Sequence, residues 1–300
     1  MWNGPTHQVR VVWTDWAEGE EKISCDYMDF NGRVGGLCTG KDFVIATRDC
    51  RVLRLPLKDG ISRACLSLVL LHSRPITCVD AQGPRVVLGD TDGCLATGCC
   101  DTHWMCSTAP LGSGPIYAVK WAPDDPVFAA GDEGGTPSLW AANEHGAPTN
   151  LAMFPAHNAN NAACTCEHGA LNIRDPGCAV SGHMGAVRAV DHVPGGIVTG
   201  GADGTVRLWD AETLEDKVIS GPGWGPVNSI AVNKRNCRVV AVACTSGPIR
   251  VLDTRTSETT MQLTHPPPCT PWESVQWIDD KLIAFNKRDI GIRYYGPWDK

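Results

Sequence analysis

The sequence predicts an all-β fold, a single β-propeller, in which a unit of short antiparallel strands repeats around a ring. Three observations favour this fold. A short motif recurs along the 300 residues, and its copies are spaced by about the length of one propeller blade. Strand-forming runs alternate with turns rich in glycine and aspartate. No long amphipathic helix is evident, so we expect no appended helical domain.

The clearest copy of the motif is GGADGTVRLWD, at residues 200–210. Its Asp203-Gly204 pair accepts the positive φ that a tight hairpin turn needs. β-Branched and aromatic side chains follow at residues 205–209, and residues 197–199 before the turn can be the partner strand. Because an isolated hairpin is marginally stable in water, this one must belong to a larger sheet.

Related hairpins recur along the chain. Their turn residues are Asp49, Asp92, Gly134, His168, Asp203, Ser246 and Asp289. The successive spacings are 43, 42, 34, 35, 43 and 43 residues. A spacing of roughly 40 to 45 residues with several short strands per unit is typical of propeller blades. We therefore expect one domain over residues 1–300, with seven blades of mostly four antiparallel strands.

The fourth blade is the irregular one. Two successive spacings are short, and residues 155–175 leave little room for a full innermost strand. We expect a truncated blade there, because HGALNIRD at residues 168–175 keeps the register of the repeated strand. The alternative is a six-bladed ring with an insertion at this place.

Closure of the ring concerns the two ends of the sequence. The last repeat ends at Tyr294-Tyr295, the third strand of its blade, whereas the strand-like residues 7–13 have no blade of their own. A closed ring leaves no sheet edge exposed. We therefore expect residues 7–13 to supply the outer strand of the last blade.

The repeat at residues 182–221, which reads GH…AVRAVDHV…IVTGGADGTVRLWD, resembles the WD-repeat propellers. The resemblance covers nearly the whole chain and is strongest here. It implies a buried hydrogen-bond network made by His183, Thr199, Asp203 and Trp209. These groups can satisfy one another, as buried polar groups must. A catalytic set could use the same residue types, but the repeat favours a structural role.

The same resemblance implies that one rim of the ring binds partner peptides. The partner-binding residues carried over are Arg33, Arg48, Tyr117, Arg188, Asn228, Glu273 and Arg288. Arg33, Arg48 and Arg288 belong to the first and last blades, which are neighbours in a closed ring. Clustered arginines favour carboxylates and phosphates, so this sector is a candidate site for an acidic or phosphorylated peptide. The alternative is a set of solvated loop charges.

Composition narrows the class of partner and the compartment. The formal net charge of −7 argues against nucleic-acid binding, and no apolar run reaches the ~18 residues of a membrane span. No secretory signal is visible at the N-terminus. The 15 cysteines are odd in number and often lie in apolar strand patterns, which is typical of reduced thiols in a cytoplasmic or nuclear protein.

One cysteine-rich motif, CTCEH, combines Cys164, Cys166 and His168, with His157 as a candidate fourth ligand. Its spacing is not a usual zinc pattern, and small side chains facing inward explain it as well. The glycines follow turns, and GGADG does not open a helix, so it is no nucleotide-binding loop. We expect neither a metal nor a cofactor.

The function expected from the resemblance is a non-enzymatic scaffold or adaptor subunit that binds protein partners within a larger complex. Two alternatives stay open. One is a WD-repeat hydrolase, and the other is a substrate-receptor subunit of a ubiquitin ligase or trafficking complex. Because a fold does not fix a function, these expectations depend on the family resemblance.

Overall fold

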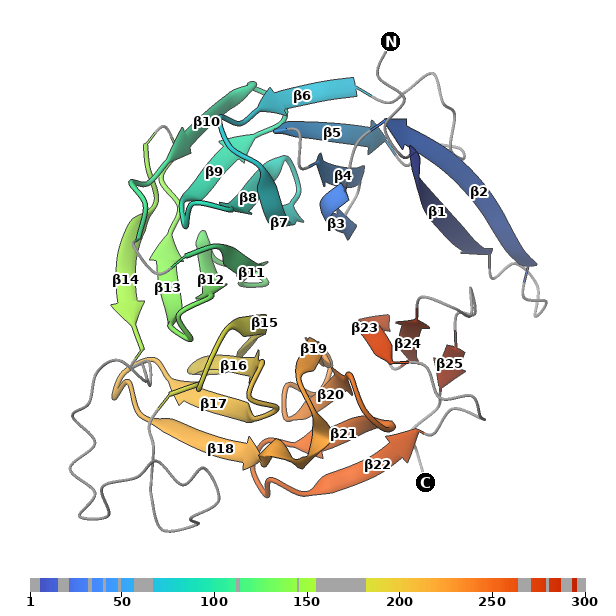
Figure 1. Ribbon diagram of the computed structural model, residues 1–300, viewed down its shortest axis with the longest axis vertical. Helices are drawn as coiled ribbons and strands as arrows, with labels where there is room; N and C mark the ends of the chain where they lie inside the picture. Colours follow the sequence, from blue (N-terminus) through green and yellow to red (C-terminus); the bar gives the residue numbers. More distant parts are fainter. Residues whose placement is uncertain are drawn as a thin grey trace.

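The structure is a computed structural model with the all-β architecture that the sequence predicts. Its strands form small antiparallel sheets arranged around a central axis, each with its first strand nearest that axis (Figure 1). The residues that it describes are 6–15, 22–31, 34–39, 42–47, 50–56, 67–111, 114–144, 146–154, 182–263, 271–278, 281–286 and 293–295.

Within these residues, six sheets have three or four strands each. The first three contain β3 (Val34–Thr39), β4 (Asp42–Thr47), β5 (Arg51–Pro56) and β6 (Ser67–Leu71); β7 (Ile76–Gln82), β8 (Arg85–Asp90), β9 (Leu95–Cys99) and β10 (Trp104–Ser107); and β11 (Ile116–Trp121), β12 (Val127–Asp132), β13 (Pro137–Ala141) and β14 (Thr149–Met153).

The remaining three sheets lie in the second half of the chain. They contain β15 (Val187–Val193), β16 (Gly196–Gly201), β17 (Val206–Asp210) and β18 (Asp216–Ser220); β19 (Val227–Val232), β20 (Val239–Cys244), β21 (Ile249–Asp253) and β22 (Thr259–Leu263); and β23 (Trp272–Ile278), β24 (Lys281–Asn286) and β25 (Arg293–Tyr295). In the part of the chain that is described, no helix is long and apolar enough to span a membrane.

The turns between the second and third strands have the backbone conformation that the motif predicts. Gly204, the second residue of the Asp-Gly pair, has a φ of 77°. The equivalent glycines are Gly93, Gly135 and Gly247, with φ values of 81°, 85° and 81°. Because this region of φ favours glycine, the repeated turn is set locally by the sequence.

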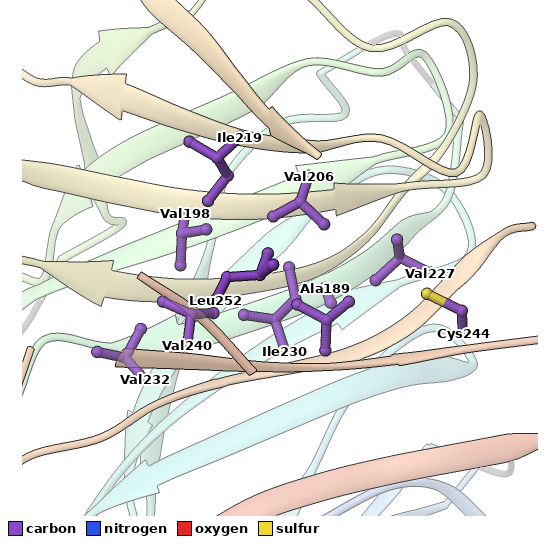
Figure 2. Close-up of a cluster of buried hydrophobic side chains, with 11 residues drawn as sticks. Ala189, Val198, Val206, Ile219, Val227, Ile230, Val232, Val240, Cys244 and Leu252 are labelled. Atoms are coloured by element: carbon purple, nitrogen blue, oxygen red, sulfur yellow. The ribbon is translucent and has the colours of Figure 1, made fainter. Parts of the chain in front are cut away.

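Neighbouring sheets meet where a β-branched side chain lies against a glycine. A Cβ added to Gly131 would lie 2.5 Å from Cγ1 of Val187, the first residue of the next innermost strand. Gly89 with Ile116 and Gly200 with Val227 repeat this contact. Between the last two of the four-stranded sheets, aliphatic side chains such as Val198, Val206, Ile230 and Val240 form one buried cluster (Figure 2).

The place of the truncated blade differs from the expectation. The β11–β14 and β15–β18 sheets are direct neighbours, because Val187 packs on Gly131 and the Phe154 and Trp209 rings lie 5.2 Å apart. No sheet therefore stands between them. With the two-stranded β1–β2 sheet, the described residues form seven sheets, and none of these is a truncated blade at the expected place. The HGALNIRD motif at residues 168–175 lies outside the described residues.

The N-terminal strand also differs from the expectation. Residues 7–13 lie in β1 (Thr6–Asp15), which pairs along its whole length with β2 (Lys22–Asn31) and not with the β23–β25 sheet. The sequence analysis did not recognise KISCDYMDFN as a strand. A partner so close in the chain costs less loop-closure entropy than one at the far end of the sequence.

Candidate functional site

The four side chains expected to form a network lie together in the β15–β18 sheet. His183 Nδ1 is 3.1 Å from Asp203 Oδ1, and its Nε2 is 2.7 Å from Thr199 Oγ1. The Trp209 indole N–H donates to the same Thr199 oxygen at 2.7 Å. Asp203 also accepts backbone N–H groups of Met184 and Thr205. The network thus joins the segment before β15 to three strands or turns of the sheet.

Electrostatics and burial decide what this network can do. Burial raises the pKa of Asp203, but the hydrogen bonds and charge of His183 and the two backbone N–H donors outweigh it and lower the pKa to about 2. His183 and Thr199 are fully buried. Because no substrate can reach an enclosed imidazole and hydroxyl, the geometry favours a structural role over a catalytic one.

A second buried pair was missed by the sequence analysis. His72 Nε2 lies 2.9 Å from Asp90 Oδ2, and both side chains are buried. The other Asp90 oxygen accepts the backbone N–H groups of Asp92 and Cys94. Asp92 before Gly93 was predicted as the turn aspartate, and Gly93 has the positive φ of that turn. The carboxylate that pairs with His72 lies two residues earlier, at Asp90. The Gly-Asp pair at 89–90, repeated at 131–132, is the signal that could have located it.

The described partner-binding candidates occupy one position, the second residue of successive innermost strands. These residues are Tyr117 on β11, Arg188 on β15, Asn228 on β19 and Glu273 on β23. Arg33, Arg48 and Arg288 lie outside the described residues.

The side chains at this position fall into two groups, those that form a hydrogen bond to the next sheet and those that are exposed to solvent. Asn228 Nδ2 donates to the Trp272 carbonyl of the next sheet at 2.8 Å, and Thr77 at the same position of β7 donates to the Ile116 carbonyl. Tyr117 and Arg188, in contrast, are exposed on adjacent innermost strands, Tyr117 by 41%. The first pair joins the sheets, and the second pair faces solvent.

Trp224, an aromatic residue just before β19, packs within the protein. It is half-buried against the cluster between the last two four-stranded sheets, and the Arg250 guanidinium lies 4.1 Å from its ring centroid. This cation–π contact occupies one face of the Trp224 ring within the protein. This contact indicates that Trp224 fills a gap between blades.

The cysteines that the structure describes are free thiols. Burial raises the pKa of Cys78 to about 12 and that of Cys244 to about 11, so both behave as packing residues. Within the described part of the chain, no group of three or more His, Cys, Asp and Glu side chains could hold a metal ion. The candidates His157, Cys164, Cys166 and His168 lie outside it.

Comparison with known proteins agrees with this geometry. The family described as "WD domain, G-beta repeat" matches residues 104–141 and 175–210. WD repeat-containing protein 1 of Gallus gallus is 23% identical over 260 residues, covering 74% of this chain and 42% of that protein. The Xenopus tropicalis protein of the same name is 24% identical with the same coverage. The chain therefore spans less than half the length of these relatives.

Solved structures show the same fold. The WD40 β-propeller domain of Doa1 superposes with a TM-score of 0.67 at 13% identity, over 92% of this chain and 82% of that one. A propeller of this kind suggests a scaffold for protein interactions. The repeat matches, the relatives and the fold together support a WD-repeat β-propeller protein.

Proposed function

We propose that this protein is a non-enzymatic scaffold that binds a protein partner on the rim carrying Tyr117 and Arg188. The observation that supports the proposal is the contrast within one repeated position. Thr77 and Asn228 donate hydrogen bonds to the next sheet, whereas Tyr117 and Arg188 are exposed. An exposed tyrosine beside an exposed arginine is the combination that dominates many binding surfaces.

The chemistry of these two side chains defines the partner. The Arg188 guanidinium can donate a forked pair of hydrogen bonds to a carboxylate or phosphate. Tyr117 offers an apolar ring with a hydroxyl at its tip. A peptide with an acidic or phosphorylated residue beside an apolar one would therefore fit. Arg33, Arg48 and Arg288, placed at the rim by the family resemblance, are proposed as further contacts of the same kind.

Rigidity of the scaffold supports this mode of binding. Tyr117 and Arg188 sit on neighbouring strands whose separation is fixed by the Val187–Gly131 contact and by the hydrogen bond from His192 to the Lys120 carbonyl, 3.0 Å long. Side chains held on packed strands lose less freedom on binding than side chains on mobile loops. The ring would thus present a preformed surface to a subunit of a larger complex.

The odd cysteine count supports a reducing compartment, so we place the protein in the cytoplasm or nucleus.

The test is affinity purification of the intact chain with quantitative mass spectrometry, beside three variants. Tyr117→Ala and Arg188→Glu should each lose a stoichiometric partner, because they remove the aromatic anchor and the anion donor. Arg85→Glu is the matched control, since Arg85 is exposed at the start of β8. A partner that stays bound to both rim variants would contradict the proposal. The circular dichroism of each variant reports whether it is folded.

A further inference from the structure

A group of basic side chains lies on the other face of the ring, away from the rim of Tyr117 and Arg188. This basic patch consists of Lys217, Lys234, Arg235, Arg238 and Arg255, all exposed. The innermost strand β19 begins on the rim side and ends beside these residues, so the two surfaces are separated by the length of a strand. We propose that the basic patch binds an acidic segment of a protein partner.

Three of the cations are held on one shaped loop, between β19 and β20. Asn233, which is buried, accepts the backbone N–H groups of Arg235 and Asn236 with its side-chain oxygen, at 2.9 and 3.0 Å. Val239 N–H donates to the Asn236 carbonyl at 2.9 Å, which closes the loop. This internal bonding presents Lys234, Arg235 and Arg238 from a defined backbone.

Contacts between loops make the patch continuous. Thr254 N–H donates to the Arg238 carbonyl at 2.8 Å, which joins the β19–β20 loop to the β21–β22 turn. Lys217 Nζ, on β18 of the preceding sheet, lies 3.4 Å from the Arg255 carbonyl. The five cations therefore cover adjoining parts of two neighbouring sheets.

Most cations of the patch differ from several other basic residues in having no carboxylate partner. Arg54, Arg74, Lys120 and Arg207 each have a carboxylate partner, Asp101, Asp92, Asp80 and Asp216 respectively. In the described ranges, no carboxylate forms an ion pair with Lys217, Lys234, Arg238 or Arg255. These four cations are available to an external anion.

One carboxylate in the β21–β22 turn, Asp253, is already occupied. Asp253 Oδ1 accepts the backbone N–H groups of Arg255 and Thr256, at 2.8 and 3.2 Å. These hydrogen bonds, with smaller contributions from the Arg255 and Arg238 charges, lower the pKa of Asp253. Asp253 thus shapes its own turn, and the cations around it stay exposed to solvent.

The surroundings of the patch favour a protein segment over a nucleic acid. Glu215 and Glu258 are exposed in the turns beside it, and the whole chain carries a formal net charge of −7. A nucleic acid brings an unbroken line of phosphates and would be repelled by these groups. A peptide with separated acidic residues can match spaced cations and avoid the glutamates.

The experiment measures binding of a fluorescent peptide of alternating glutamate and glycine to the purified full chain at about 0.15 M salt. Lys234→Glu/Arg238→Glu should weaken binding about tenfold, because two attractive charges become repulsive. Arg238→Glu alone should weaken it by a smaller factor, about threefold. Arg85→Glu, which makes the same charge change elsewhere, should leave the affinity within a factor of about 1.5.

Two results would overturn the proposal. One is equal affinity of the wild type and Lys234→Glu/Arg238→Glu, with circular dichroism showing both to be folded. The other is tighter binding of a single-stranded oligonucleotide than of the peptide at the same salt, which would assign the patch to nucleic acid. Arg188→Glu, measured in parallel, separates this proposal from the rim. The glutamate–glycine peptide has no apolar residue for Tyr117, so it should bind that variant nearly as it binds the wild type.

Discussion

At the scale of single residues, Thr199 shows how one hydroxyl can hold a sheet together. Its oxygen accepts the Trp209 N–H and contacts His183 Nε2, and it has no exposed surface. If the oxygen accepts from Trp209, its own proton is free for the imidazole, which leaves the other ring nitrogen to donate to Asp203. Each group forms a hydrogen bond with the next, so loss of any member leaves a buried polar group without its hydrogen-bond partner.

Thr199→Val should lower the free energy of unfolding by about 1 to 3 kcal/mol, because it leaves the Trp209 N–H and the His183 ring nitrogen unsatisfied at nearly constant volume. Urea unfolding followed by tryptophan fluorescence measures this loss. Thr259→Val, an exposed threonine on β22, is the control and should stay within about 0.5 kcal/mol of the wild type. Equal stability of the two variants would show that the network contributes nothing.

Asp203 should make stability depend on acid. Its pKa is lowered from 3.8 to about 2 in the folded protein, so the unfolded chain takes up the proton first as the pH falls. The stabilisation is complete above about pH 4 and is lost towards pH 2. Over that interval the wild type should lose about 2 kcal/mol more unfolding free energy than Asp203→Asn, which has no proton to bind.

The measurement is urea unfolding at a series of pH values, with Asp124→Asn as the control. Asp124 is exposed in the loop before β12, and its variant should follow the wild-type slope. Parallel slopes for the wild type and Asp203→Asn would argue that the folded protein does not hold this carboxylate in its charged form.

At the scale of strands and sheets, the contact of Val187 with Gly131 defines which sheets are neighbours. It lies between β12 and β15, whose sheets were expected to flank a truncated blade. The same contact of a β-branched side chain with a glycine occurs for Ile116 on Gly89 and for Val227 on Gly200. These are pairs of sheets that were expected to be neighbours. The repeated geometry is therefore the basis for reading the β11–β14 and β15–β18 sheets as direct neighbours.

Gly131→Ala should destabilise the protein by about 1 to 3 kcal/mol, because the new methyl group would lie 2.5 Å from Val187. Val187→Ala combined with Gly131→Ala should recover part of that loss, a coupling that arises only between residues in contact. Gly221→Ala is the control, since its added Cβ meets nothing within 4 Å. Strict additivity of the two substitutions, measured by thermal unfolding, would mean that another blade separates the sheets.

The sequence was informative where the backbone obeys local rules. The glycines of the repeated turns and the residues around His183 follow from short motifs, so their positions could be predicted. The pairing of β1 with β2 depends on competition between distant partners, which no local pattern resolves. The buried carboxylate Asp90 was missed because two aspartates stand two residues apart in the same turn, and packing selects between them.

At the scale of the whole molecule, the ring separates two proposed surfaces by the length of its strands. The rim of Tyr117 and Arg188 and the basic patch around Arg238 lie at opposite ends of the strands, and the sheet of β15–β18 contributes Arg188 to the first and Lys217 to the second. Both are carried by a packed framework of buried aliphatic side chains (Figure 2). Such a framework can hold two partners at once without coupling their binding.

We expect binding at the rim and binding at the basic patch to be independent of each other. Arg188→Glu should reduce capture of the rim partner and leave the acidic peptide affinity unchanged, and Lys234→Glu/Arg238→Glu should do the reverse. Titration of the peptide into the chain with and without its purified rim partner measures the coupling directly. A change in peptide affinity beyond about twofold would contradict independent surfaces.

These contacts between a glycine and a β-branched side chain have a consequence for how such a molecule could gain or lose sheets over evolutionary time. At three places a sheet has a glycine on its second strand and the next sheet has a β-branched side chain against it, at Gly89, Gly131 and Gly200. A duplicated sheet would carry both halves of the joint with it. The ring is thus assembled from interchangeable parts, and the gain of a whole sheet needs no new joint to be invented.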